Sequence, residues 1–176
     1  MSAVTNMYRE HQDLVAFFGD DNPSFQASLE RTLPKVLLLA AASEFEVAVC
    51  QHIRNYATES STDKKLAIMI DRWVLTRQYH RLFDWDSKHA GPLWAAFGED
   101  FKRYMKSRLK EDGNLKDSLD AFLEIGRLRN ELVHQDYANY VLLKTSSEIF
   151  KMYETATRFV DSLPQILATQ MDESPE

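Results

Sequence analysis

The sequence has few of the residues that interrupt helices and little of the pattern that builds sheets. Only five of its 176 residues are glycine and five are proline. No regular run alternates Val, Ile or Thr with polar residues, as a half-buried strand would. Hydrophobic residues make up 44% of the chain, and its length suits one domain with a substantial core. We therefore expect an all-α, single-domain helical bundle.

Cysteine pairs, metal motifs and long apolar runs are also missing. The single cysteine, Cys50, excludes a disulfide framework and lies in an apolar stretch, so we interpret it as a core residue in a reducing compartment. The five histidines lack zinc-ligand spacing and the glycines form no phosphate loop, so we expect no metal and no cofactor. The longest apolar run, 36–42, is too short to cross a bilayer, and residues 1–9 lack a signal-peptide core. We expect a cytoplasmic protein with no membrane partner.

The net charge of −6 argues against a protein that coats nucleic acid through bulk charge. A local basic track is still possible, because residues 101–110 would place four cations on one face of a helix. These candidate RNA-binding residues are Lys102, Arg103, Lys106 and Lys110. The stripe fits a solvated helix face as well as an RNA track, and by itself it does not decide between them.

Apolar periodicity and capping residues predict the helices. We expect them at about 7–18, 24–33, 34–58, 60–79, 94–110, 114–136 and 146–167. Capping boxes are predicted at 60–63 and 145–148, a helix cap at Asn114 and a helix start at Pro34. The aromatic-rich segment 82–98 is expected to be a long ordered connection that packs down on the bundle. The domain would span 1–169, followed by a frayed tail, 170–176.

One arginine occupies an unexpected place in the helix that ends near residue 136. At about 100° per residue, Arg129 falls at the centre of the apolar arc marked by Phe122, Ile125 and Val133. The polar residues of the opposite side, expected to face solvent, are Glu124, Arg127 and Glu131. In a structural interpretation, Arg129 extends its methylenes over the core or pairs with a buried acid, for which Glu44 and Glu46 are the candidates. In a functional interpretation, Arg129 belongs to a binding or catalytic site.

Two neighbouring residues support the interpretation in which Arg129 belongs to a site. Asn130 and His134 are four residues apart, which stacks them on one edge of the same arc. A guanidinium, an amide and an imidazole would then lie together. The other four histidines, at positions 11, 52, 80 and 89, are interpreted as structural residues.

The segment Arg129-Asn-Glu-Leu-Val-His134 resembles the Arg-(four to six residues)-His motif of the HEPN superfamily of small all-helical domains, in the variant with Asn after Arg. Arg127 with His134 also fits the looser form of the motif. Together with Ser43-Glu-Phe-Glu46 and Thr145-Ser-Ser-Glu-Ile-Phe150, the segment is similar to the RiboL-PSP-type branch, over roughly residues 30–165. Some HEPN toxins have a tyrosine two residues after the histidine, where this chain has Asp136.

This resemblance implies a metal-independent endoribonuclease that acts as a homodimer and leaves 2′,3′-cyclic phosphate ends. Arg129, Asn130 and His134 would be the catalytic residues, with Glu44 and Glu46 in support. A histidine can exchange protons at neutral pH, and an arginine presents a fork of donors to phosphate. One chain would supply one such histidine, so a twofold pair would supply both base and acid.

The sequence also allows two alternatives to a nuclease. The chain could be a non-catalytic module that binds RNA, a nucleotide or a partner protein, or Arg129 could be purely structural. As a nuclease it would be a toxin or an antiphage defence effector, with an antitoxin or a defence complex as a possible partner. The connection 82–98 is the expected source of substrate specificity.

Overall fold

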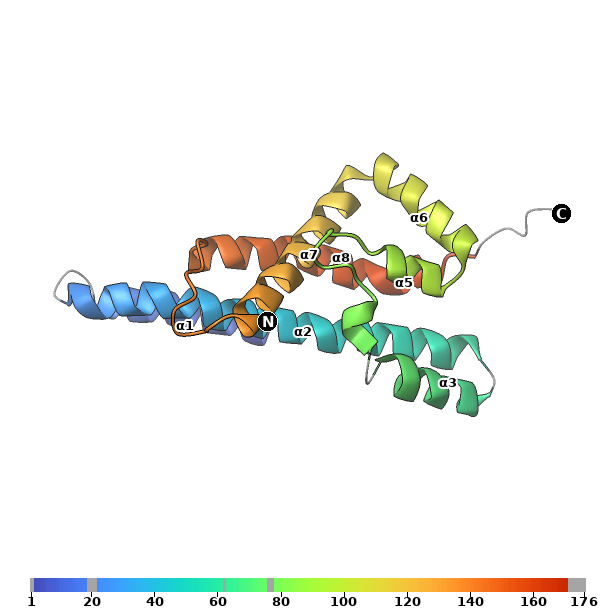
Figure 1. Cartoon of the computed structure of the whole chain (residues 1–176), viewed down its shortest axis with the longest axis horizontal. Coiled ribbons are helices and arrows are strands. Elements are labelled where there is room, and N and C mark those ends of the chain that lie inside the picture. Colours follow the sequence, from blue (N-terminus) through green and yellow to red (C-terminus); the bar gives the residue numbers. More distant parts are fainter. Residues whose placement is uncertain (1, 19–21, 62, 76–77, 171–176) are drawn as a thin grey trace.

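The computed structural model describes residues 2–18, 22–61, 63–75 and 78–170, and most of this length is helical (Figure 1). The all-α prediction is confirmed, because the described residues contain no strand and only one isolated bridge, between Asp84 and His89. Residues 19–21, between the predicted helices 7–18 and 24–33, and residues 171–176 of the predicted tail lie outside the described part.

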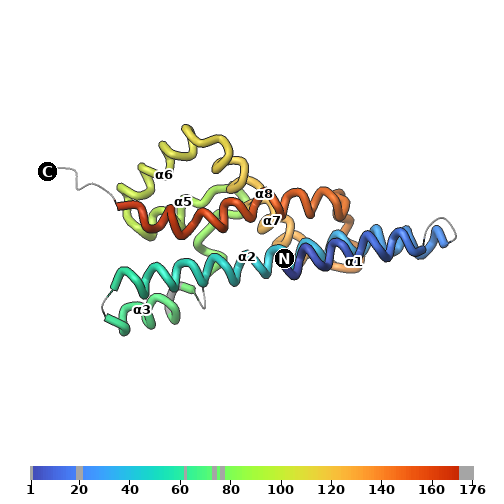
Figure 2. Tube along the Cα trace, turned by 180° about the vertical axis from the view of Figure 1, so that it is seen from behind, coloured from blue at the N-terminus to red at the C-terminus, as the bar shows by residue number. Residues whose placement is uncertain are grey.

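Two long helices form the base of the molecule. α1 (Ala3–Phe18) and α2 (Pro23–Ser60) lie side by side, and α8 (Ser146–Leu167) runs above α2 in a similar direction. α7 (Gly113–His134) crosses one side of the pair formed by α2 and α8 and packs most extensively against α8 (Figures 1 and 2). The C-terminal end of α7, where the predicted site lies, therefore reaches the middle of α2.

The predicted helix boundary at Pro34 is wrong, because α2 runs through this proline without a break. A proline inside a helix removes one hydrogen bond and costs roughly 3 kcal/mol. Here Leu33, Pro34 and Leu37 are all buried where α1 and α8 cover α2, so tertiary packing offsets this cost. Local rules identified the proline as a helix start, but the surrounding core determines the outcome.

Helix boundaries in the middle of the chain also differ from prediction. The predicted capping box at 60–63 is absent, since α3 (Lys64–Ile70) is capped by Asp63, whose side chain accepts from the Lys65 amide. A π-helical turn, Asp71–Leu75, follows within the predicted helix 60–79, and a 3₁₀ turn, Tyr79–Arg81, begins at the last residue of that range. A search for apolar residues at the α-helical period of 3.6 residues does not detect such irregular turns.

The predicted helix 94–110 is two helices. They are α5 (Gly91–Ala96) and α6 (Glu99–Glu111), separated at Gly98, whose φ of 107° is accessible to glycine. Asp112, not Asn114, caps α7, with its side chain accepting from the Leu115 amide at 2.9 Å. The capping box of Thr145 and Glu148 at the start of α8 is confirmed.

The connection 82–98 packs down on the bundle, as predicted. Phe83, Trp85 and Trp94 are buried, and their rings contact Phe122 and Phe159 at the centre of the core. Cys50, predicted to be a core residue, is only half-buried. Burial and the nearby carboxylate of Glu46 raise the pKa of its thiol, which disfavours the reactive thiolate.

Candidate functional site

The three residues of the predicted site lie on the last two turns of α7. Arg129 and Asn130 are partly exposed, and His134 is exposed at the final helical position. The Nη1 atom of Arg129 donates a hydrogen bond to Oδ1 of Asn130 at 3.1 Å. The structure thus brings together an arginine, an amide and, one turn later, an accessible imidazole. Their catalytic roles stay predictions.

A shallow pocket borders Arg129 and Asn130. Its apolar wall includes Phe45, Trp85 and Phe122, and its polar lining comes from Glu46 of α2 together with Tyr79 and His80 of the 3₁₀ turn. Tyr79 is buried, and burial together with the charge of Glu46 raises its pKa, while Arg129 acts in the opposite direction. The guanidinium therefore shares its surroundings with a carboxylate and a second imidazole.

Sequence reasoning missed His80, Trp85 and Gly126 as parts of this site. Trp85 packs directly on Gly126 of α7, and its indole nitrogen donates to the His80 carbonyl oxygen at 3.0 Å. The indole thereby joins the 3₁₀ turn to the helix that carries Arg129. A glycine inside a helix was the only signal in the sequence, since it often marks a close approach. Nothing in the sequence distinguished His80 from the other histidines.

The expected ion pair between Arg129 and a glutamate is not formed. Glu44 instead accepts a hydrogen bond from the hydroxyl of Tyr153, whose oxygen also lies within hydrogen-bonding distance of the Ser2 hydroxyl. Glu46 lines the pocket with Arg129, yet no carboxylate among the described side chains forms an ion pair with this guanidinium. The structure therefore argues against the interpretation in which Arg129 is neutralised inside the core.

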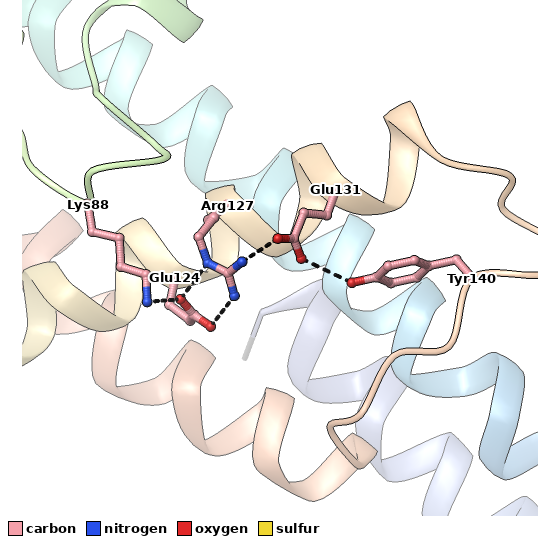
Figure 3. Close-up of polar contacts among 5 residues, drawn as sticks. All are labelled: Lys88, Glu124, Arg127, Glu131 and Tyr140. Carbon is pink, nitrogen blue, oxygen red and sulfur yellow. Dashed lines mark hydrogen bonds and ion pairs between the residues drawn. The ribbon is translucent and has the colours of Figure 1, made fainter.

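The opposite side of α7 was expected to be solvated, and this prediction is wrong. Arg127 binds Glu124 through two nitrogens, at 3.0 and 2.8 Å, and also binds Glu131 (Figure 3). Lys88 approaches Glu124 at 2.7 Å, and the Tyr140 hydroxyl donates to Glu131 at 3.1 Å. Only 24% of the Arg127 side chain and 18% of that of Glu124 are exposed.

This network separates the two arginines that fit the HEPN motif. The Arg127 guanidinium lowers the pKa of Glu124 to about 2, with burial acting in the opposite direction and Lys88 adding to the decrease. Glu124 in turn raises the pKa of Arg127. Because Arg127 is held by two carboxylates, Arg129 is the arginine with donors left for a ligand.

The segment after His134 is fixed by a buried lysine. Lys35 of α2 is only 4% exposed; its amine donates to the Tyr137 carbonyl oxygen at 2.8 Å and lies 5.1 Å from the centre of the Tyr137 ring. Asp136 stabilises the same turn, and hydrogen bonds from Asn139 and Ala138 lower its pKa. No pattern in the sequence indicated that Lys35 would contact a residue 102 positions away.

Large apolar side chains are exposed in the segment of the chain that contains His134. Val133 and Tyr137 are more than two-fifths exposed, and Val141 and Leu143 reach 72% and 91%. A surface of this kind favours contact with another protein surface. The dimer expected from the sequence stays a prediction.

The predicted cationic stripe lies on α6. Lys102 and Arg103 form ion pairs with Glu99 and Asp100 of the same helix, and Lys106 and Lys110 are exposed. Their role in RNA binding is not decided by these contacts. Among the described residues no group of three or more potential ligands could hold a metal ion, and none of the described helices is long and apolar enough to span a membrane.

Comparison with known proteins identifies the family. The model of the RiboL-PSP-HEPN family matches residues 6–169, which is nearly the whole chain. Neither the curated proteins nor the solved structures yielded a match. The matched range contains α7 with its Arg129 to His134 motif and the Thr145 cap of α8. The chain therefore belongs to the RiboL-PSP-type HEPN family.

Proposed function

We propose that this protein is a metal-independent endoribonuclease that acts as a homodimer, in the role of a toxin or an antiphage defence effector. Family membership indicates RNA cleavage or RNA binding as the general function. One observation favours cleavage. Arg129 lies beside Asn130 and one turn before an exposed His134, without an ion pair to any described carboxylate, while the neighbouring Arg127 is fully engaged.

The reaction needs two proton transfers and a cation. The 2′-oxygen of a ribose attacks the adjacent phosphorus and loses its proton to a base, while the bond from phosphorus to the 5′-oxygen breaks and that oxygen takes a proton from an acid. Imidazole suits either transfer near neutral pH. The Arg129 guanidinium would donate to the non-bridging oxygens, whose negative charge grows in the transition state. Asn130 would orient the guanidinium through their hydrogen bond.

The second imidazole would come from a partner subunit. The exposed apolar residues Val133, Tyr137, Val141 and Leu143 belong to the same segment of the chain as His134 and would offer a surface for such a dimer. A twofold axis close to the end of α7 would bring two copies of this helix together, because a twofold interface uses the same patch of both subunits. Two arginines and two histidines would then share one cleft.

The main alternative is a non-catalytic module that binds RNA, a nucleotide or a partner protein through the same residues. It would use Arg129 for a phosphate contact but would not need an imidazole. The two functions therefore differ in what they require of His134.

Purified protein incubated with total cellular RNA in EDTA tests the proposal. We expect fragments with 2′,3′-cyclic phosphate ends, and a loss of roughly a hundredfold to ten-thousandfold in rate for His134→Ala. His52→Ala is the matched control, because it removes a histidine of α2 that does not line the pocket with Arg129. Cleavage that needs Mg²⁺, or that persists in His134→Ala, would contradict the mechanism. RNA binding without any cleavage would favour the alternative.

A further inference from the structure

A groove with an excess of lysines lies at the other end of α7 from the proposed catalytic residues. It is formed by the connection before α5, by α6 and by the first turns of α7. Its polar lining consists of Lys88, His89, Lys102, Lys106, Lys116 and Asp120. Four lysines thus face one carboxylate within a chain whose net charge is −6. Such a local excess of positive charge attracts anions, although the chain as a whole is acidic.

The backbone before α5 brings Lys88 and His89 to the groove. Asp84 and His89 pair through two backbone hydrogen bonds, and the Asp84 side chain accepts from the Ser87 amide at 2.9 Å. Lys88 has a φ of 52°, a left-handed conformation that is unfavourable for a residue with a side chain. A glycine would relieve this strain but would remove the amine.

Most of the lysine amines are only loosely engaged within the protein. Lys102 pairs with Glu99 and Lys116 with Asp120, both within one helix and both exposed, and such pairs contribute little to stability. Lys106 has no ion pair with any described residue. A phosphate could therefore replace these carboxylate partners at little cost. Lys88 is held more firmly, because its partner Glu124 is mostly buried, and phosphate would not replace this carboxylate as easily.

We propose that this groove binds the sugar-phosphate backbone of RNA outside the cleavage site. The proposal rests on the proposed function and adds a second contact region for the same substrate. The groove would contribute affinity without base selection, because lysines act as point charges and the aromatic ring in its wall, Trp94, is buried. Two residues of the predicted stripe, Arg103 and Lys110, do not line the groove.

The distance from the cleavage residues sets a minimum substrate length. Lys116 precedes Arg129 by 13 residues on one helix, which corresponds to roughly 20 Å at about 1.5 Å per residue. A stacked strand advances about 3.4 Å per nucleotide, so the rise along the helix alone requires at least roughly six nucleotides. Shorter RNA would be cut without help from the groove.

Two double variants test the groove against bulk charge. Lys106→Ala with Lys116→Ala removes two cations of the groove, whereas Arg103→Ala with Lys110→Ala removes two cations of α6 outside it. Each pair lowers the net charge by two, and each breaks one ion pair within a helix, to Asp120 or to Asp100. The two variants are thus matched in charge and in the kind of ion pair that each removes.

Binding of an RNA of about 20 nucleotides is measured in the His134→Ala background, so that cleavage cannot interfere. Each phosphate contact with a single strand contributes about 0.7 to the slope of log affinity against log salt, which corresponds to about fivefold in affinity near 0.1 M salt. We expect the groove variant to bind about 25-fold more weakly, with a slope lower by about 1.4, and the control to change less than about threefold.

Equal losses in the two variants, or no loss in either, would overturn the proposal. With His134 intact, the groove variant should raise the KM for the long RNA and leave cleavage of a dinucleotide unchanged. If no RNA is cut but the groove variant still loses affinity selectively, the proposed function fails and the groove stands. If RNA is cut and the two variants bind alike, the groove fails and the proposed function stands.

Discussion

The indole ring of Trp85 lies against the backbone of Gly126, so close that a Cβ on residue 126 would be 2.0 Å from the ring atom Cζ3. Trp85 lines the pocket next to Arg129 and contacts Phe83 and Phe122 in the core. The absence of a single side chain on α7 therefore lets the connection 82–98 form one wall of the candidate site.

Replacing Gly126 by alanine should disturb this wall. We expect Gly126→Ala to lower the free energy of unfolding by about 1–3 kcal/mol, since the ring must move away from a well-packed position. Tryptophan fluorescence should shift as Trp85 moves. Gly113→Ala, at the start of the same helix, is the control, because a Cβ there meets nothing within 4 Å. It should be neutral or stabilising by up to about 1 kcal/mol, and equal effects of the two variants would contradict the packing argument.

The two arginines of α7 should respond differently to replacement by methionine. Arg127→Met leaves the mostly buried Glu124 without the partner that binds both of its carboxylate oxygens, so we expect a loss of about 2 kcal/mol in stability. Arg129→Met breaks only the hydrogen bond to Asn130 and should change stability by less than about 1 kcal/mol. Chemical denaturation measures both values.

The same two variants should differ in cleavage rate in the opposite direction, with Arg129→Met losing more activity than Arg127→Met. We expect Arg129→Met to reduce cleavage roughly a hundredfold or more, because the transition state loses its fork of donors. Arg127→Met, assayed where it is still folded, should keep most of its activity. A result in which Arg127 and not Arg129 is required would assign the motif to the other arginine.

Local patterns in the sequence predicted much of the fold, and tertiary contacts account for most of the differences. The Thr145 cap and the aromatic connection follow from residue types at short range. The continuity of α2 through Pro34 and the burial of Lys35 depend on helices distant in sequence. In the site, the spacing of Arg129, Asn130 and His134 placed them correctly on α7. Glu46, one of the two acids expected near Arg129, lines the same pocket, whereas His80 comes from an element that no spacing rule connects to α7.

His80 offers a test of whether the site needs a second subunit. It lines the same pocket as Arg129, so a single chain holds two histidines near this arginine. In the dimer mechanism both imidazoles are copies of His134, and His80→Ala should keep activity within about tenfold of the native rate, against a loss of at least about a hundredfold for His134→Ala. Equal losses, with a monomer in analytical ultracentrifugation, would assign the second proton transfer to His80 instead.

Lys35 should control the order of the segment that follows His134. Lys35→Met keeps the apolar length of the side chain but removes the donor to the Tyr137 carbonyl, which we expect to cost about 1–3 kcal/mol. Amide hydrogen exchange in residues 135–140 should accelerate more than exchange in α8. Lys151→Met, on the exposed side of α8, is the control and should leave both regions unchanged. Uniform acceleration would show that Lys35 supports global stability only.

Glu124 should make the stability of the protein depend on pH in the acidic range. Its pKa is lowered from 4.5 to about 2, chiefly by the hydrogen bonds from Arg127, so the unfolded chain binds its proton more readily than the folded one. The stabilisation is complete above about pH 5 and is lost as the pH falls towards about 2, with an upper value of about 3 kcal/mol. The difference in unfolding free energy between native protein and Glu124→Gln should therefore shrink over this range.

Glu99→Gln removes an exposed carboxylate of α6 and should differ from the native protein by less than about 1 kcal/mol throughout. A difference for Glu124→Gln that stays constant with pH would mean that the ion network of Arg127 does not hold this carboxylate in its charged form.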